Sequence, residues 1–161
     1  QPQPPSDSLG FAWAHLTDPN GVGNGYRWQV KRPTKFVVFE GSPLILDRRY
    51  IAPSGATFDD KFIDGKSFDF AYFRPYDPTE ASYYEDEPEE ERGYYKYSDT
   101  IYIRFSTLDK ASQDFYRTYE AAMSSNGNPF ASPVTVLSNI KGGGLGVWAG
   151  MGVAYDTIYG Q

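Results

Sequence analysis

The segment SNIKGGGLGVWAGMGVAYD, residues 138–156, contains six glycines and decides how the end of the chain folds. Glycine occurs at this density in phosphate-binding loops, in flexible linkers and in strands that need bare backbone. A P-loop ends in Gly-Lys-Ser/Thr, but Lys141 precedes these glycines and no Ser or Thr directly follows them. The dinucleotide fingerprint G-x-G-x-x-G begins at Gly144, but Ala149 replaces its last glycine and no helical pattern follows. The segment therefore favours a strand over an anion site.

A period of two residues runs through the same segment. One predicted face is apolar, with Leu145, Val147, Ala149, Met151, Val153 and Tyr155. The other face is nearly bare, with Gly146, Trp148, Gly150, Gly152 and Ala154. We expect the apolar face to join the core, and the bare face to let another backbone approach closely. Residues 142–144 would supply a turn or bulge where the strand begins.

Four other segments predict strands: GYRWQVKR (25–32), KFVVFEG (35–41), PSGATFDDKFIDGKSFDFAYF (53–73) and YYKYSDTIYIRFS (94–106). The first alternates apolar and polar residues, which predicts one solvated face. The third contains Asp64–Gly65, a strong hairpin turn dipeptide, and places Phe68, Phe70 and Tyr72 on one face. In the fourth, Ile101, Ile103 and Phe105 share a face.

The segment STLDKASQDFYRTYEAAMSSNG, residues 106–127, predicts one helix. Ser106 and Asp109 resemble a capping pair, and Asn126–Gly127 is a typical stop signal. An apolar stripe of Phe115, Tyr119 and Met123 would pack on a sheet. The expected fold is therefore all-β, a mostly antiparallel sandwich or partly open barrel, with one α-helix in the C-terminal half. Residues 1–10 resemble a linker, and residues 11–161 form one β-rich domain.

Composition excludes several classes of function. The chain has no cysteine, which rules out disulfides, zinc–thiolate sites and a cysteine nucleophile. Eight of the 21 acidic residues lie between positions 77 and 91, where no Lys or Arg occurs, so the remaining 13 acids face 15 bases. This balance leaves no basic stripe for nucleic acid. No apolar run approaches the ~20 residues of a membrane span, so any membrane attachment would use an anchor outside this chain.

Exposed aromatic residues are the most informative candidates for binding. Tyr83, Tyr84, Tyr94 and Tyr95 flank the acidic segment, and Trp148 stands on the bare face of the predicted last strand. Tyrosine and tryptophan beside carboxylates can stack on sugars or anchor a protein partner. The alternative interpretation is an ordinary ladder of aromatic cross-strand pairs.

The chain offers little for catalysis or for metal binding. His15 is the only histidine, and its period with Phe11 and Trp13 predicts a packing or hydrogen-bonding role at the end of a strand. The acidic run 85–91 does not match an EF-hand loop, and we interpret it as solvated. Asp59, Asp60 and Asp64 are typical of turn chemistry, although a carboxylate pair for glycoside hydrolysis stays open. We expect no cofactor, no metal and no catalytic residue.

Several segments together resemble a family of Bacteroidetes cell-envelope lipoproteins of unknown function. The most specific is NPFASPVTVLSNIKGGGLGVWAGMGV (128–153), which is similar to the family's C-terminal signature. LTDPNGVGNGYRW (16–28), FDDKFIDGKSF (58–68) and YRTYEAA (116–122) also match, so the resemblance covers about residues 11–156. Two departures are Lys141, where the family commonly has an acidic residue, and one additional glycine. The family's N-terminal sandwich domain and lipidated cysteine have no counterpart, which suggests a C-terminal portion.

The resemblance implies an exported protein associated with the outer membrane, often encoded beside a TonB-dependent receptor, and it implies no catalytic residue. The expected function is therefore a non-enzymatic envelope accessory or binding module whose partner is such a receptor or another envelope protein. A carbohydrate-binding module that uses exposed Tyr and Trp is the first alternative. A hydrolase with an unplaced carboxylate pair is the second.

Overall fold

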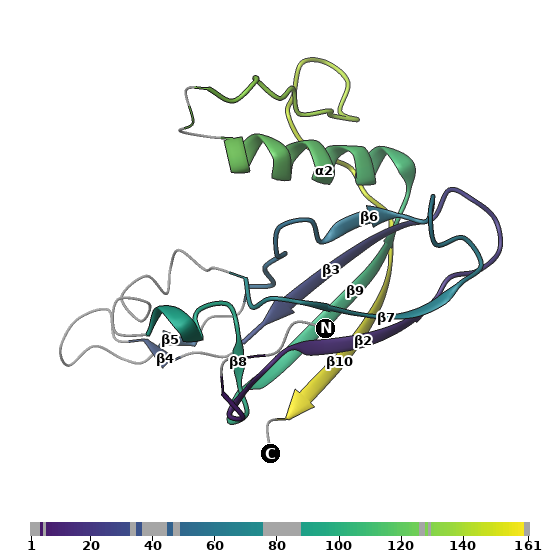
Figure 1. The fold of residues 1–161 in the computed structure, drawn as a ribbon. Helices are drawn as coiled ribbons and strands as arrows, with labels where there is room; N and C mark the ends of the chain where they lie inside the picture. The colour runs from purple at the N-terminus through teal and green to yellow at the C-terminus, as the bar shows by residue number, and fades with distance from the viewer. Residues whose placement is uncertain are drawn as a thin grey trace.

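The computed structural model describes residues 4, 6–32, 35–36, 45–46, 49–75, 88–125, 128 and 130–159. In this part of the chain, antiparallel strands and a single α-helix form three stacked layers (Figure 1). A four-stranded sheet lies in the middle, helix α2 covers one of its faces, and the two-stranded sheet β2–β7 covers the other. The expected all-β fold with one helix is therefore confirmed.

The central sheet has the strand order β10-β9-β3-β6, with every neighbouring pair antiparallel. Its strands are β3 (Gly25–Lys31), β6 (Thr57–Asp59), β9 (Thr100–Leu108) and β10 (Met151–Tyr159). Ile101 and Ile103 are buried on the predicted common face of β9. The prediction that one face of β3 is solvated is wrong, because Arg27 and Gln29 are buried beneath α2 and the segment around Tyr50.

The second layer pairs β2 (Ala12–Thr17) with β7 (Ser67–Tyr72). Residues of β7 alternate as predicted, so Phe68, Phe70 and Tyr72 face inward. The core between the layers is aromatic: the rings of Trp28 and Phe70 meet edge to face, with centroids 5.5 Å apart. Edge-to-face contact is one of the arrangements that aromatic rings prefer, so this pair helps to hold the two layers together.

Helix α2 (Lys110–Ser125) docks through polar residues and not through its apolar stripe. Ser112 and Gln113 are its buried residues, whereas Tyr119 and Met123 of the predicted stripe are 44% and 56% exposed. The predicted capping role of Ser106 is also wrong, because Ser106 belongs to β9.

The N-cap of α2 is Asp109. One carboxylate oxygen of Asp109 accepts the backbone N–H of Ser112 at 2.8 Å, and the other accepts the Ser112 hydroxyl at 3.0 Å. The hydrogen bonds from the Ser112 N–H and, to a smaller extent, from its hydroxyl hold the pKa of Asp109 below its usual range. The predicted stop pair, residues 126–127, lies outside the described residues.

The predicted hairpin over residues 53–73 is wrong, although its turn is present. β6 pairs with β3 in the central sheet, and β7 pairs with β2 in the second layer. Gly65 has φ +67°, and a Cβ there would lie 2.2 Å from the side-chain oxygen of Asn20. Glycine is therefore required at this turn, which moves the chain between layers instead of folding it back on itself.

The last strand is shorter than predicted and oriented differently. β10 begins at Met151, and residues 138–150 form an irregular, largely exposed segment that we call the glycine loop. The bare face of β10 points toward the core, since Ala154 lies opposite Phe105, while Val153 and Tyr155 are exposed. The predicted close approach of a neighbouring strand is found at Gly152, where a Cβ would lie 2.6 Å from Thr107 Oγ1 of β9. Nothing lies within 4 Å of a Cβ built at Gly142, Gly143 or Gly150.

Short elements complete the described structure: β1 (Leu9–Gly10) with β8 (Tyr95–Lys96), β4 (Lys35–Phe36) with β5 (Ile45–Leu46), and the 3₁₀ helix η2 (Glu89–Glu91). Leu9 is buried, so the folded region begins slightly before the predicted boundary at residue 11. Among the described residues, no helix has the length and apolar character needed to cross a membrane.

Candidate functional site

The outward face of the β2–β7 sheet carries a row of aromatic and polar side chains. Four facing pairs form it, and we call them the outer strip. Three are cross-strand pairs, Trp13 and Ala71, His15 and Asp69, Thr17 and Ser67, and the fourth is Phe11 and Phe73, whose rings are in contact just beyond the paired residues. This face exists because β2 alternates strictly, with Ala12, Ala14 and Leu16 turned inward. The outer strip is open to solvent, since Trp13 is 45% exposed and Phe73 is 53% exposed.

Tyr94 joins the aromatic end of the outer strip. Its ring lies 5.2 Å from Phe11 and 5.7 Å from Phe73, and Phe11 lies 5.2 Å from Phe73. All three contacts are edge-type, which leaves ring surface of Phe73 facing solvent. Tyr94 is therefore the one residue of the predicted tyrosine set that lies on an exposed aromatic surface of the described structure.

The middle of the outer strip is polar. His15 Nδ1 lies 2.7 Å from Asp69 Oδ1, and the two side chains are 61% and 70% exposed. Beside them, the hydroxyls of Thr17 and Ser67 form a hydrogen bond of 2.9 Å. His15 thus has the predicted hydrogen-bonding role, within β2 rather than at its end, and both pairs keep free lone pairs or protons toward solvent.

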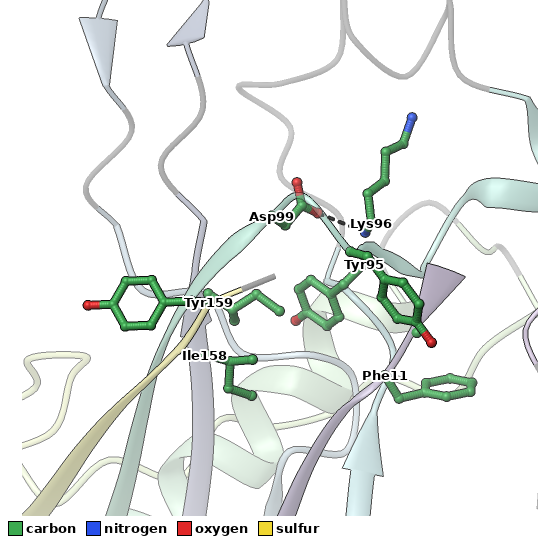
Figure 2. Close-up of a pocket in the computed structure, with 9 residues that line it drawn as sticks. Phe11, Tyr95, Lys96, Asp99, Ile158 and Tyr159 are labelled. Atoms are coloured by element: carbon green, nitrogen blue, oxygen red, sulfur yellow. Dashed lines mark hydrogen bonds between the residues drawn. The ribbon is translucent and has the colours of Figure 1, made fainter. Parts of the chain in front are cut away.

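Tyr95 points to the opposite side from Tyr94 and is buried. It lines a cavity of about 360 Å³ together with Ile101, Ile158 and Tyr159. Figure 2 shows this cavity between β8 and the end of β10, with Lys96 and Asp99 at its rim. The side-chain oxygen Oδ2 of Asp99 accepts the backbone N–H of Lys96 at 3.0 Å. Tyr95 is only 3% exposed, so the prediction that it offers an exposed ring is wrong.

A second cavity, of about 380 Å³, opens between β2 and β10. Its floor is made of core aromatics, Trp28, Phe70 and Phe105, and its rims carry His15 and Asp156. The cavity exists because Ala14 and Ala154, which also line it, are too small to fill the space between the two strands. It is the open side of the sandwich-like stack.

Trp148 lies in the glycine loop, far from Tyr94. The loop is closed by the side chain of Asn139, which accepts the N–H of Trp148 at 2.8 Å and donates to its carbonyl at 2.7 Å. The indole is 82% exposed, and neighbouring Leu145 is 86% exposed. Figure 1 places this loop beyond α2 and places β8 at the opposite end of the molecule. The structure therefore does not bring the predicted aromatic residues into one site.

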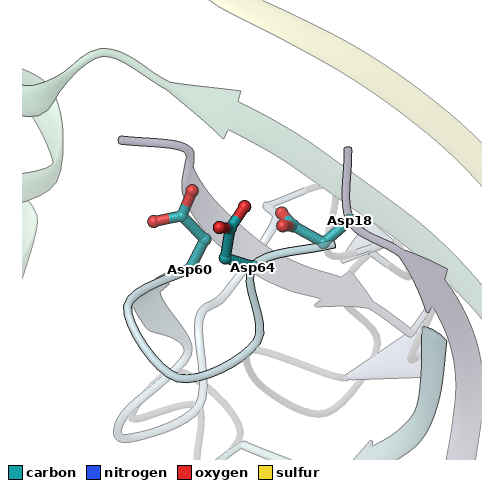
Figure 3. A group of neighbouring side chains, drawn as sticks. All are labelled: Asp18, Asp60 and Asp64. Carbon is teal, nitrogen blue, oxygen red and sulfur yellow. The ribbon is translucent and has the colours of Figure 1, made fainter. Parts of the chain in front are cut away.

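Three aspartates gather where the loop after β2 meets the turn after β6 (Figure 3). Asp18 and Asp60 are buried and Asp64 is exposed, and one carboxylate oxygen from each lies within 4.8 Å of the others. These residues could hold a divalent cation, which prefers oxygen ligands. Asp59 of the predicted acidic cluster lies apart from them, exposed at the end of β6.

The three carboxylates already serve the two loops. Asp60 accepts hydrogen bonds from the N–H groups of Gly23 and Asn24. Asp18 accepts from the N–H of Gly65 and the hydroxyl of Tyr26. Asp64 accepts from the N–H of Gly21. The N–H groups of Asn24 and Gly23 hold the pKa of Asp60 below its usual range. Burial and the contact with Asp18 raise the pKa of Tyr26. The interpretation as turn chemistry is therefore confirmed for Asp60 and Asp64.

Sequence reasoning missed the main part of the outer strip. Trp13 and Asp69 were not among the predicted binding residues, although FAWAHLTD shows the alternation that turns Trp13 and His15 to one face. The pairing with Asp69 is long-range and leaves no local signal. Tyr83, Tyr84 and most of the acidic segment lie outside the described residues.

Comparison with family models, with curated proteins and with solved structures found no match to this chain.

Proposed function

We propose that this chain is a non-catalytic binding module of the cell envelope, and that its C-terminal part docks onto a protein partner. The supporting observation is the number of large apolar side chains that residues 130–159 leave exposed, some in the segment before β10 and others along β10. The most exposed of them are Phe130, Leu145, Trp148, Tyr155 and Tyr159. Leu145 and Trp148 are exposed in the same loop, and grouped apolar side chains are typical of protein–protein contacts, whereas scattered single residues are not.

The free edge of β10 adds a backbone component to this surface. In the described structure β10 pairs with β9 on one side, and its nine residues have no strand on the other. Natural proteins protect such edges with Lys, Pro or bulges. The sequence MGVAYDTIY contains no Lys, Arg or Pro. An extended segment of a partner could therefore extend the sheet by strand addition, with Val153 and Tyr155 as side-chain contacts.

The partner class follows from the resemblance to envelope lipoproteins encoded beside TonB-dependent receptors. We propose an outer-membrane receptor or a neighbouring envelope protein as the partner, and an outer-membrane-associated location reached through an anchor outside this chain. The hydrolase alternative gains no support from the described carboxylates. Asp18 and Asp60 converge, but their oxygens accept loop hydrogen bonds, and neither residue lines a cavity described above.

Site-specific photocrosslinking tests the proposal. A photoreactive phenylalanine analogue would replace Tyr155 on the β10 edge and, as a control, Phe62, which is equally aromatic and 77% exposed in the turn after β6. After irradiation in envelope extract of a Bacteroidetes species, the Tyr155 probe is expected to capture an envelope protein identifiable by mass spectrometry. The Phe62 probe is expected not to capture it. Equal capture by both probes, or none by the Tyr155 probe, would overturn the proposal.

A further inference from the structure

We propose that the outer strip binds a neutral, linear oligosaccharide. This inference concerns a second surface, on the face of the molecule opposite α2, and it goes beyond the proposed protein contact at β10. It rests on three properties of the outer strip: its shape, the order of its aromatic and polar groups, and its charge.

The shape is that of a narrow platform. Successive pairs on one face of a strand are about 6.7 Å apart, so the four pairs from Phe11–Phe73 to Thr17–Ser67 span about 20 Å. The platform is two strands wide, which gives an area of about 200 Å². A stable protein interface needs about 800 Å² from each partner. The outer strip therefore fits a thin, extended ligand rather than a folded protein.

The aromatic groups suit the apolar faces of sugar rings. Ala71, opposite Trp13, is too small to cover the indole, which leaves it available for stacking. One pair along, Phe73 presents a second ring supported edge-on by Phe11 and Tyr94. Aromatic side chains at this spacing can contact neighbouring sugar units through C–H groups that point at the ring faces.

The polar groups suit sugar hydroxyls, which both donate and accept hydrogen bonds. Asp69 can accept from a hydroxyl through the oxygen that His15 does not engage, and His15 keeps Nε2 for another. The hydrogen bond between His15 and Asp69 orders both side chains before a ligand arrives, which lowers the entropy cost of binding. Thr17 and Ser67 offer two more hydroxyls at the next position.

The charge of the outer strip disfavours polyanionic ligands. His15 and Asp69 are the only ionisable side chains of the outer strip's four pairs, and they are already paired with each other. No Lys or Arg belongs to these pairs, and Lys66, next to Ser67, is an exposed cation only at the end of the strip, so a polyanion lying along the strip would lack a row of cations to match it. A neutral polyhydroxylated chain is the ligand whose charge matches.

The test measures binding of neutral hexasaccharides built from glucose, xylose or mannose, with an acidic oligogalacturonide for comparison, by isothermal titration calorimetry. The variants are Trp13→Ala, Asp69→Ala and the control Tyr119→Ala. Tyr119 is matched to Trp13 in exposure, 44% against 45%, and lies on α2 across the central sheet. Thermal melts verify that each variant folds, as expected for such exposed positions.

At least one neutral oligosaccharide is expected to bind. Trp13→Ala should weaken that binding about tenfold, the loss expected for one stacked ring. Asp69→Ala should weaken it too, and Tyr119→Ala should leave it unchanged. Three outcomes would overturn the inference: no neutral binding up to about 5 mM sugar, binding of the acidic oligomer alone, or equal affinity in Trp13→Ala. Since Tyr155 lies outside the outer strip, failure of the β10 crosslink would leave this result unaffected.

Discussion

Replacing Glu120 by leucine should be among the more damaging single changes to this fold. Glu120 Oε1 lies 2.5 Å from Arg27 Nη1, and the two side chains are 19% and 8% exposed. The same oxygen accepts the Thr57 hydroxyl at 2.8 Å. The substitution therefore leaves the Thr57 hydroxyl without its acceptor and the buried guanidinium without its carboxylate, although Arg27 Nη1 still donates to Thr57 Oγ1.

The expected cost follows from that geometry. Breaking a buried ion pair by removing one partner costs about 3–5 kcal/mol. Arg27 keeps a cation–π contact with Tyr116, whose ring centre lies 4.0 Å away, and this contact offsets about 1 kcal/mol. We therefore expect Glu120→Leu to lower the free energy of unfolding by about 3 kcal/mol. Urea unfolding followed by circular dichroism measures it.

Two companion variants make the reasoning falsifiable. Lys110 and Asp114 form a pair of similar length, 2.6 Å, on the same helix, but the Lys110 side chain is 66% exposed. Lys110→Ala should cost less than about 1 kcal/mol, because exposed pairs contribute little. The double variant Arg27→Met with Glu120→Leu should recover most of the loss, since no unpaired charge remains buried. A cost for Glu120→Leu no greater than that for Lys110→Ala, or a double variant less stable than the single one, would contradict a stabilising buried ion pair.

Three further predictions concern individual carboxylates. Asp109→Ala should lower the stability by about 1 kcal/mol through loss of the N-cap, whereas Asp109→Asn should retain most of it in the same urea assay. The N–H groups of Asn24 and Gly23 lower the pKa of Asp60 in the folded state. The stabilisation that ionised Asp60 provides is therefore complete above the pKa of an unfolded aspartate, about 3.9, and is lost as the pH falls through the lower folded-state pKa. Stability of Asp60→Asn should accordingly decline less steeply than wild type below about pH 5, as urea midpoints measured at each pH would reveal. Millimolar CaCl₂ should not raise the melting temperature, since loop donors already occupy the aspartate oxygens; a rise of several degrees would show that a cation binds the folded state there.

The strands of the central sheet could be predicted because their signal is local. Alternation in β3 and β9 identifies both strands and the buried face of β9. Their partners could not be predicted, because strand pairing depends on residues far apart in the chain. The Asp64–Gly65 turn signal indicates where the chain reverses, yet the strands on its two sides enter different sheets. Likewise, the polar face of β3 is buried only because α2 docks on it.

The overextended last strand has a similar physical cause. Period-two alternation continues back to Leu145, but a strand needs a partner, and β10 obtains one only from β9. Met151 pairs with Leu108, the last residue of β9, and Asp109 then caps α2 and ends the ladder. The glycine loop therefore extends up to residue 150, because β9 offers no hydrogen-bonding edge to residues before Met151, even though their sequence continues to alternate.

The predicted binding residues Tyr94 and Tyr95 lie on opposite sides of the chain for an equally simple reason. Tyr94 and Tyr95 are consecutive, and consecutive residues on an extended backbone point to opposite sides. One of the two therefore had to turn inward, and β8 places Tyr95 in the core while Tyr94 reaches the outer strip. A sequence pattern shows that one ring of such a pair is exposed, but the fold decides which one.

The energetics of the glycine loop connect these observations to function. Fixing each residue of an irregular segment costs about 1–2 kcal/mol of conformational entropy, whereas a typical hydrogen bond contributes about 1 kcal/mol. The hydrogen bonds within the loop join the Asn139 side chain to Trp148 and the Ser138 hydroxyl to Ile140, Gly144 and Gly146, and they are too few to offset that cost alone. Covering Leu145 and Trp148 would add about 1.5–3 kcal/mol for each side chain. A protein partner on this surface would thus supply the apolar burial that the loop lacks, and its binding would stabilise the C-terminal part of the chain more than the central sheet.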